Sequence, residues 1–401
     1  MFVQEATIVG GGLCGLALAL FLDKQNIRST IYELRPTGQT SAGAIMLSPN
    51  ALRSLDAIGV YQRIKSRGYN FRDLTFRNNE HEILDAYEMG NADRYGYDAL
   101  RVYRQVLLEE LKAMATEAGI QVQYEKRFSH VVTETEHEVT FAFTDGETMT
   151  TQLLIGADGI NSAVRGYIKV DVKAIFSGIM AITCAIPTKD IRVPFEPYQT
   201  PVSIHGTSGA FILAAQNPEG GEMLGGIQYC THDRSRAEWD ALLQDKTQLL
   251  SMMKKDYETW NPMVRSALDA IPPETIDIWA FHSVPRLDSW KSKYGRVLII
   301  GDAAHAIPPA AGQGINQGFE DVHSLSIITA AAKNNNEWVK YLEGWQTFRS
   351  ERVEYVISLT NEMSKRRMPG WNGQGAEKID SAWLFEVDIE AEMQKVVGTV
   401  Q

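Results

Sequence analysis

Three glycines near the start of the chain restrict the fold more than any other feature of the sequence. Residues 3–34 read VQEATIVGGGLCGLALALFLDKQNIRSTIYEL. Apolar, β-branched residues precede the glycines, a Leu- and Ala-rich segment of helix length follows them, and residues 30–34 return to strand-forming residues. Strand, tight turn, helix and strand in this order predict a βαβ unit, the start of a parallel sheet in an α/β fold.

The same glycines have the spacing of a dinucleotide-binding turn. Gly10 permits the tight turn, Gly12 lets a pyrophosphate approach the backbone, and Gly15 lets the helix pack closely on the strand. Glu33 ends the second strand, where its carboxylate can accept hydrogen bonds from ribose hydroxyls and would repel a 2′-phosphate. The unit is predicted to bind the adenosine of FAD or NAD rather than of NADP. The alternative is a glycine-rich turn with a surface glutamate.

A second strand-turn-helix pattern lies near the middle of the chain. Residues 153–165 read LLIGADGINSAVR, an apolar strand followed by Asp158 and Gly159. Asn161 or Ser162 is expected to cap the helix that begins there. Taken alone, this stretch predicts no more than a turn between a strand and a helix.

A third stretch, VLIIGDAAHAIPPAAGQGINQGFED at 297–321, places Asp302 directly after a buried strand. In open α/β sheets ligands bind beyond the carboxyl ends of the strands, and a carboxylate there suits the hydroxyls of a polyol. The loop 308–314 offers backbone N–H groups at a helix start, suited to a ring carbonyl that gains negative charge, and its small side chains leave room for a flat ring. The alternative is a glycine-lined turn with a solvated aspartate.

Composition excludes several classes of protein. The chain has 401 residues, 44% of them apolar and 22% charged, which predicts a globular protein of two joined domains. A net charge of −11 argues against a nucleic-acid partner. The one short basic run, 365–367, is interpreted as a solvated helix end. The N-terminus lacks a basic leader and glycines interrupt its apolar segment, so neither a signal peptide nor a membrane span is expected.

Cysteine usage points to a reducing compartment. Cys14, Cys184 and Cys230 are odd in number and far apart, which predicts neither a disulfide framework nor a metal site. A cytoplasmic protein, monomeric or homodimeric, is expected.

The remaining chain divides into strand-rich and helical parts. Asp145-Gly146 marks a hairpin turn, and residues 174–230 are β-rich. Ser235 and Glu238 fit a capping box, residues 319–332 read as a helix, and a long helix is predicted at about 337–364 from its apolar stripe. Beyond Pro369, closely spaced glycines predict a surface extension.

Together the three motif stretches resemble the FAD-dependent monooxygenases of the para-hydroxybenzoate hydroxylase and salicylate hydroxylase type. Their order and spacing match, and weaker matches occur at 43–59, 104–111 and 341–352. The resemblance covers 1–60, 100–166 and 280–360, whereas 167–280 matches only in general character.

The resemblance implies a Rossmann-like FAD-binding domain with a parallel sheet, an inserted β-rich substrate domain and C-terminal helices. The expected FAD-binding domain is discontinuous, at 1–75, 100–170 and 285–335. Residues 76–99 and 171–284 would form the substrate domain, and 336–401 a helical segment and tail.

The resemblance also implies roles for single residues. Arg104 would lie along the dinucleotide, Asp302 would hold the ribityl or pyrophosphate side of FAD, and Asp158 with Arg165 would link the FAD groove to NAD(P)H docking. The implied cofactor-binding residues are Gly10, Gly12, Leu13, Gly15, Glu33, Leu34, Arg35, Arg104, Asp158, Arg165, Asp302, Gly312, Gln313, Gly314 and Ile315. The implied catalytic residues, beside the flavin ring, are Pro308, Gly312 and Gly314, whereas His305 is expected to be structural.

The implied reaction is a monooxygenation. NADPH or NADH reduces FAD, O2 forms a C4a-(hydro)peroxyflavin, and this oxygenates a small aromatic or secondary-metabolite substrate. Candidate substrate contacts are His205, Phe211, Gln228 and Tyr229, although each could be an ordinary sheet residue, and no catalytic base is assigned. The alternatives are a flavin oxidoreductase without oxygen insertion, a flavin halogenase and a non-catalytic FAD- or NAD-binding module.

Overall fold

The computed structural model describes residues 2–39, 43–375 and 379–398. Its first layer is a five-stranded, all-parallel sheet in the order β18 (Val297–Ile299), β12 (Leu154–Gly156), β1 (Glu5–Val9), β2 (Arg28–Tyr32) and β8 (Gln121–Gln123). The predicted βαβ unit is thereby confirmed, and it forms the centre of this sheet.

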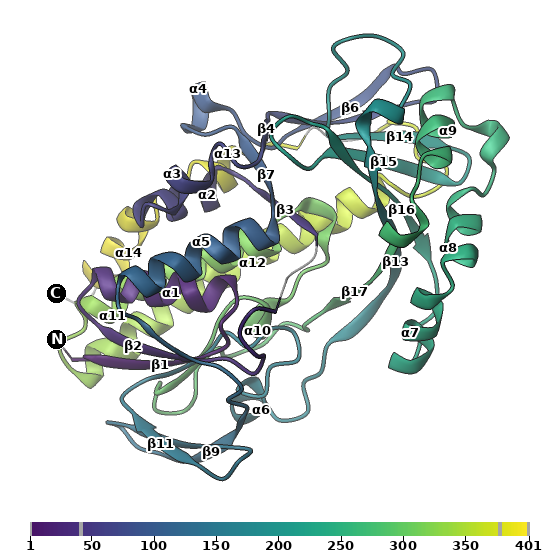
Figure 1. The fold of residues 1–401 in the computed structure, drawn as a ribbon. Coiled ribbons are helices and arrows are strands. Elements are labelled where there is room, and N and C mark those ends of the chain that lie inside the picture. Colours follow the sequence, from purple (N-terminus) through teal and green to yellow (C-terminus); the bar gives the residue numbers. More distant parts are fainter. Residues whose placement is uncertain (1, 40–42, 376–378, 399–401) are drawn as a thin grey trace.

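Helices and a small sheet cover the two faces of the parallel sheet (Figure 1). On one side lie α1 (Leu13–Lys24), α5 (Arg104–Glu117) and α11 (Gly314–Ala331). On the other lies a three-stranded sheet of β9 (Phe128–Glu134), β10 (Val139–Phe143) and β11 (Thr148–Thr151). The turn at Asp145-Gly146 joins the last two strands, as predicted. Because α1 is buried nearly all round, its Leu and Ala residues pack on both the sheet and the neighbouring helices.

A second large sheet has seven strands, in the order β17 (Asp277–Ser283), β13 (Ile175–Pro187), β16 (Glu222–Cys230), β15 (Gly209–Ala215), β14 (Val202–Gly206), β5 (Asp73–Arg77) and β6 (Ile83–Glu88). On one face, the apolar side chains of its central strands build a separate core with α7 (Arg236–Gln244), α8 (Lys246–Met253) and α9 (Pro262–Asp269). The other face, which we call the inner face, contributes Leu74, Phe76 and Tyr87 to the larger core, which also contains the parallel sheet. The capping box of Ser235 and Glu238 begins α7, as predicted.

Smaller elements connect the two large sheets. The strands β3 (Ala44–Leu47), β7 (Ala99–Tyr103) and β4 (Tyr69–Phe71) form a three-stranded sheet. Beside it lie α2 (Pro49–Ala57), α3 (Val60–Ile64) and α4 (Ala92–Tyr95), and α6 (Arg165–Ile168) follows β12. In the described ranges no helix combines the length and the apolar character needed to cross a bilayer.

The C-terminal region corrects two predictions. The long helix α12 (Asn335–Lys365) is present, but the chain beyond Pro369 is not a surface extension. It continues into α13 (Ala382–Phe385), which contacts α2, and α14 (Ile389–Gly398), which packs against α11 and α12. The basic run at the end of α12 is also not solvated, because Arg366 and Arg367 are 1% and 4% exposed.

Candidate active site

The carboxyl ends of neighbouring strands bring the three motifs together. Since β2, β1, β12 and β18 are adjacent and parallel, the residues that follow them lie along one edge of the sheet. Glu33 follows β2, the glycine turn follows β1, Asp158 follows β12 and Asp302 follows β18. Segments nearly 300 residues apart in sequence thus share one edge.

The glycine turn leaves space for a ligand on one side only. A Cβ on Gly10, whose φ is +111°, would lie 2.4 Å from the Ala157 carbonyl oxygen. A Cβ on Gly15 would lie 1.9 Å from the Gly10 carbonyl oxygen, so both positions require glycine. At Gly12, by contrast, a Cβ would meet nothing within 4 Å. This open backbone at the start of α1 is suited to a pyrophosphate.

The carboxylate of Glu33 is held in place by the backbone. Its Oε2 accepts a hydrogen bond from Gly11 N (2.7 Å), and its Oε1 accepts one from Arg35 N (2.8 Å). A carboxylate has about four lone-pair positions, so both oxygens can still accept ribose hydroxyls. Leu34 and Arg35 are exposed beside it.

Asp302 and Arg104 present free charges near the start of α1. Both are exposed, and neither side chain forms a hydrogen bond or ion pair with any described residue. Both act on Cys14 in the first turn of α1: burial raises the pKa of its thiol, the Asp302 charge raises it further, and the Arg104 charge lowers it. An anionic group for hydroxyls and a cationic group for phosphates therefore flank the open glycine.

Buried side-chain hydrogen bonds fix the loop before α11. The Gln313 side chain is fully buried and donates to Ser48 Oγ (2.8 Å). Asn316 Nδ2 donates to the carbonyl oxygens of Gly312 (2.6 Å) and Met46 (3.0 Å). Gly312 has φ +66°, a conformation that favours glycine. These contacts fix a helix N-terminus whose first N–H groups remain free for a ligand.

The Asp158 carboxylate turns back onto its own loop. Its Oδ1 accepts from Ser162 Oγ (2.5 Å), and its Oδ2 accepts from the backbone N–H groups of Ala163 (2.8 Å) and Val164 (3.2 Å). Burial raises its pKa, and these bonds oppose the rise. Asp158 therefore caps this turn, the role that the sequence suggested for Asn161 or Ser162. Arg165 is buried and donates to the carbonyl oxygens of Ala303 (2.9 Å) and Ile160 (2.7 Å). Both side chains hold the loop, and their part in NAD(P)H docking stays a prediction.

The four candidate substrate residues lie on opposite faces of the seven-stranded sheet. Phe211 belongs to the core under α7–α9, and Tyr229 packs against that core, with its Oη donating to the Met252 carbonyl oxygen (2.6 Å). Their proposed contact with substrate is corrected, because they face away from the cofactor edge. His205 and Gln228 alternate with such core residues and lie on the inner face.

A buried ion network behind the loop was missed by the sequence analysis. Arg349 donates to Asp321 Oδ1 (2.8 Å) and also binds Glu320, and Arg352 donates to both oxygens of Glu320 (2.5 and 2.8 Å). His305 Nε2 lies 2.5 Å from Asp321 Oδ2, which supports its expected structural role. The signal was available: Arg349 and Arg352 lie three residues apart on the same stripe as the apolar residues of α12.

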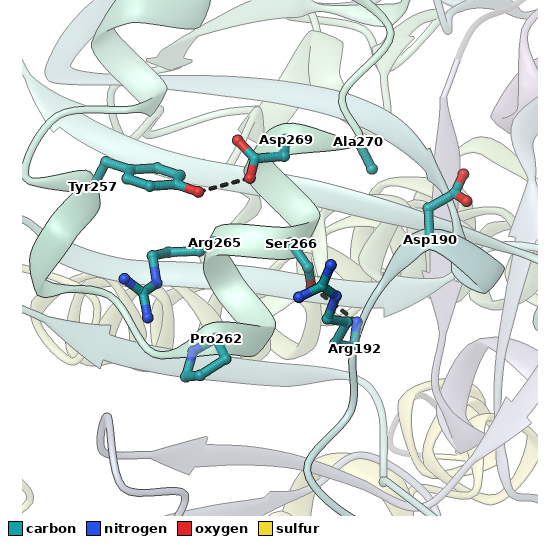
Figure 2. A pocket seen from close by; sticks show the side chains of 8 residues that line it. All are labelled: Asp190, Arg192, Tyr257, Pro262, Arg265, Ser266, Asp269 and Ala270. Carbon is teal, nitrogen blue, oxygen red and sulfur yellow. Dashed lines mark hydrogen bonds between the residues drawn. The ribbon is translucent and has the colours of Figure 1, made fainter.

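A surface hollow of about 470 Å³ lies on the opposite, helical side of the seven-stranded sheet (Figure 2). Tyr257 Oη donates there to Asp269 Oδ2 (2.6 Å), and Lys254 pairs with the same carboxylate (3.0 Å). It contains none of the predicted site residues, and its charges are mixed in sign. We assign it no role.

Comparison with known proteins agrees with the site. Residues 4–360 match the family described as FAD binding domain. The chain belongs to this family. It is 29% identical to a salicylate hydroxylase of Pseudomonas putida, over 96% of this chain and 93% of the relative. It is 27% identical to hispidin-3-hydroxylase of Neonothopanus nambi, over 98% and 96%.

Solved structures show the same fold. A salicylate hydroxylase substrate complex has a TM-score of 0.81 at 20% identity, covering 99% of this chain and 98% of that one. HpxO of Klebsiella pneumoniae, complexed with FAD and uric acid, has a TM-score of 0.77 at 22% identity, covering 100% and 98%. The predicted fold class and the resemblance to FAD-dependent monooxygenases are confirmed, and the cofactor is FAD.

Proposed function

We propose that this FAD-dependent monooxygenase uses NADH or NADPH as electron donor and hydroxylates a small aromatic substrate. The observation that carries the proposal is the meeting of the glycine turn, Asp302 and the start of α11 at one sheet edge. The curated relatives named above are hydroxylases, which supports the reaction type.

The residues at this edge divide the recognition of FAD between them. Gly12 and the start of α1 would bind the pyrophosphate, with Arg104 alongside it. Glu33 would accept the ribose hydroxyls of the adenosine, and Asp302 the hydroxyls of the ribityl chain. FAD, when bound, supplies the transfer of electrons from NAD(P)H and the activation of O2.

The loop at 308–314 would position the flavin ring. Gly314, where a Cβ would meet only the Ile307 carbonyl oxygen at 3.7 Å, would let a planar ring lie close, whereas Met46 fills the Cβ side of Gly312. The free N–H groups at the start of α11 would stabilise negative charge on a ring carbonyl. Pro308, the first residue of the loop, would lie beside the ring. The anchoring of Gln313 and Asn316 keeps these donors fixed during the reaction.

The inner face of the seven-stranded sheet would bind the substrate. On this face Ala181, Ala210, Ala214 and Gly226 are small, with Ile212 between the two alanines of β15, and they alternate along the strands with the large residues of the outer core. Small side chains leave room for a flat molecule between the sheet and the flavin loop. The burial of the same positions would restrict the access of water to the substrate and the flavin ring.

The test is a screen of the purified, FAD-loaded protein. NADH and NADPH consumption and O2 uptake are measured together with a panel of hydroxylated benzoates, pyrones and phenols. The proposal expects a compound that stimulates both and yields a product one oxygen heavier. NAD(P)H consumption without O2 uptake, linked to oxidation or reduction of a compound, would instead establish an oxidoreductase that inserts no oxygen.

A further inference from the structure

The basic run at the end of α12 contains three cations in three different environments. Lys365 is exposed. Arg366 is buried and forms ion pairs with Asp85 and with Glu362 (3.2 Å). Arg367 is 4% exposed and forms no ion pair with any carboxylate of the described chain. Burial alone lowers the pKa of Arg367 to about 10, which leaves it charged at neutral pH without a counter-charge from the described residues.

Arg367 lies between the flavin loop and the inner face of the seven-stranded sheet. Its Nη1 donates to the carbonyl oxygen of Ala310 (2.7 Å), two residues before Gly312. Its own carbonyl oxygen accepts from Ala210 N (3.2 Å) on β15. The chain then places Trp371 against His205, with ring centroids 4.8 Å apart. In Figure 1, α12 runs from the side of α11 toward the seven-stranded sheet.

Among the described residues, no carboxylate acts on the Arg367 guanidinium. Within the same part of the chain, His205 Nε2 and Gln228 Oε1 are buried on the inner face without a hydrogen-bond partner, and Arg367 Nε also lacks one. Burial, and secondly the charge of Arg367, lower the pKa of His205 to about 4, so its ring is neutral at pH 7. Buried polar groups normally find partners, and an unpaired buried cation is costly. Ala210, a small residue, lies opposite His205 across the strands.

We propose that the Arg367 guanidinium binds an anionic oxygen of the substrate, a carboxylate or a phenolate, on the inner face beside the flavin loop. His205 and Gln228 complete the polar contacts of the same ligand. Arg367 is then a specificity-determining residue, and the enzyme prefers aromatic anions over neutral aromatics of the same shape. This inference rests on the proposed function, because it names the substrate class of that site.

The experiment compares matched ligand pairs on the FAD-loaded enzyme. Salicylate is paired with salicylamide and 3-hydroxybenzoate with 3-hydroxybenzamide, and dissociation constants are read from the change in the flavin absorption spectrum. We expect each anion to bind at least tenfold more tightly than its amide. Arg367→Gln should remove this preference by weakening the anion alone, since a hydrogen bond to a charged group contributes about tenfold or more in affinity.

Two further variants separate recognition from general effects. Arg367→Lys keeps the charge and should restore part of the preference, although it loses the planar fork. Lys365→Gln removes an exposed charge two residues away and should leave the preference unchanged. Full FAD content and an unaltered flavin spectrum without ligand show that each variant is folded.

The outcomes separate this inference from the proposed function. Equal binding of anion and amide, binding of neither, or a preference that survives Arg367→Gln overturns the role of Arg367, even where an aromatic compound stimulates NAD(P)H and O2 consumption. An Arg367-dependent preference without any stimulated O2 consumption supports the anion site and contradicts the monooxygenase reaction.

Discussion

Buried arginines lie in the middle of α12 and just beyond its end, but only those in the middle have carboxylate partners among the described residues. Arg349 and Arg352 meet Glu320 and Asp321 in a network with no exposed member. Arg367, just beyond the helix, is buried with only the Ala310 carbonyl oxygen as its described side-chain partner. A buried charge with its counter-charges holds two helices together, whereas one without them is available to a ligand. Arginine thus stabilises the fold in the middle of α12 and, on our proposal, recognises the substrate just beyond its end.

Breaking the ion network of Arg349 and Arg352 should have the largest effect on stability. Arg349→Met leaves the charges of Glu320 and Asp321 partly uncompensated in the core, and we expect the free energy of unfolding to fall by about 3–5 kcal/mol. Lys340→Met, at an exposed position of the same helix, is the control and should change it little. Chemical denaturation measures both. Equal stabilities of the two variants would show that the network does not hold α11 to α12.

Acid should also weaken this ion network, with the second-largest effect on stability. Burial acts to raise the pKa of Glu320, but Arg352 and Arg349 lower it to about 2. Because the folded-state pKa is depressed, this contribution is complete above the unfolded-state value of 4.5 and is lost as the pH falls toward about 2. We expect a loss of about 3 kcal/mol at most from this group, since one pKa unit corresponds to about 1.4 kcal/mol. Denaturation between pH 6 and 2 tests this; a Glu320→Gln variant should show a flatter dependence, and an equally steep one would contradict the assignment.

At the sheet edge that would hold FAD, the exposed Asp302 carboxylate has no partner among the described residues. We assign it to a ligand, as we do Arg367. Asp302→Ala should weaken FAD binding by about 1.5–3 kcal/mol, the contribution of a hydrogen bond to a charged group. Flavin fluorescence gives the dissociation constant. Asp240→Ala, an exposed aspartate on α7, serves as the control. An Asp302→Ala protein that retains FAD with unchanged affinity would remove Asp302 from the site.

The smallest effect on stability is expected at Arg367. Arg367→Met removes a buried charge that has no counter-charge in the described part of the chain, and well-packed apolar replacements of buried charges are often neutral or stabilising. We expect the free energy of unfolding of the ligand-free protein to change by about 1 kcal/mol or less, or to rise. Denaturation under the conditions used for Arg349→Met provides the comparison. A loss as large as that of Arg349→Met would mean that Arg367 supports the fold.

The fold around the cofactor could be predicted because its signals are local. The glycine turn, Glu33 and Asp302 each follow a strand that its own residues define, and parallel strands then bring them to one edge. The tail could not be predicted in the same way. Its glycines at 370–375 lie beyond Lys365, where α12 ends. The burial of Met393 depends on the contacts of α14 with α11 and α12, and Phe385 packs against Tyr95, far away in the sequence.

For the candidate substrate residues of the seven-stranded sheet, the sequence limits the prediction in a different way. Alternation in a strand predicts that His205 and Ile204, or Gln228 and Tyr229, point to opposite faces, but not which face meets the cofactor. Half of the candidates therefore fell on the wrong face. The run at 365–367 carried no sign that its first residue is exposed and its last buried, because the burial of Arg367 comes from Ala310 and the sheet rather than from its neighbours.

The most direct test of the account is the fate of molecular oxygen. The FAD-loaded enzyme is incubated with NADH or NADPH, 18O2 and an aromatic anion that stimulates turnover, and the product is analysed by mass spectrometry. The account predicts one 18O atom in the product for each NAD(P)H consumed. An unlabelled aromatic compound, with all of the oxygen recovered as hydrogen peroxide for every such anion, would contradict it.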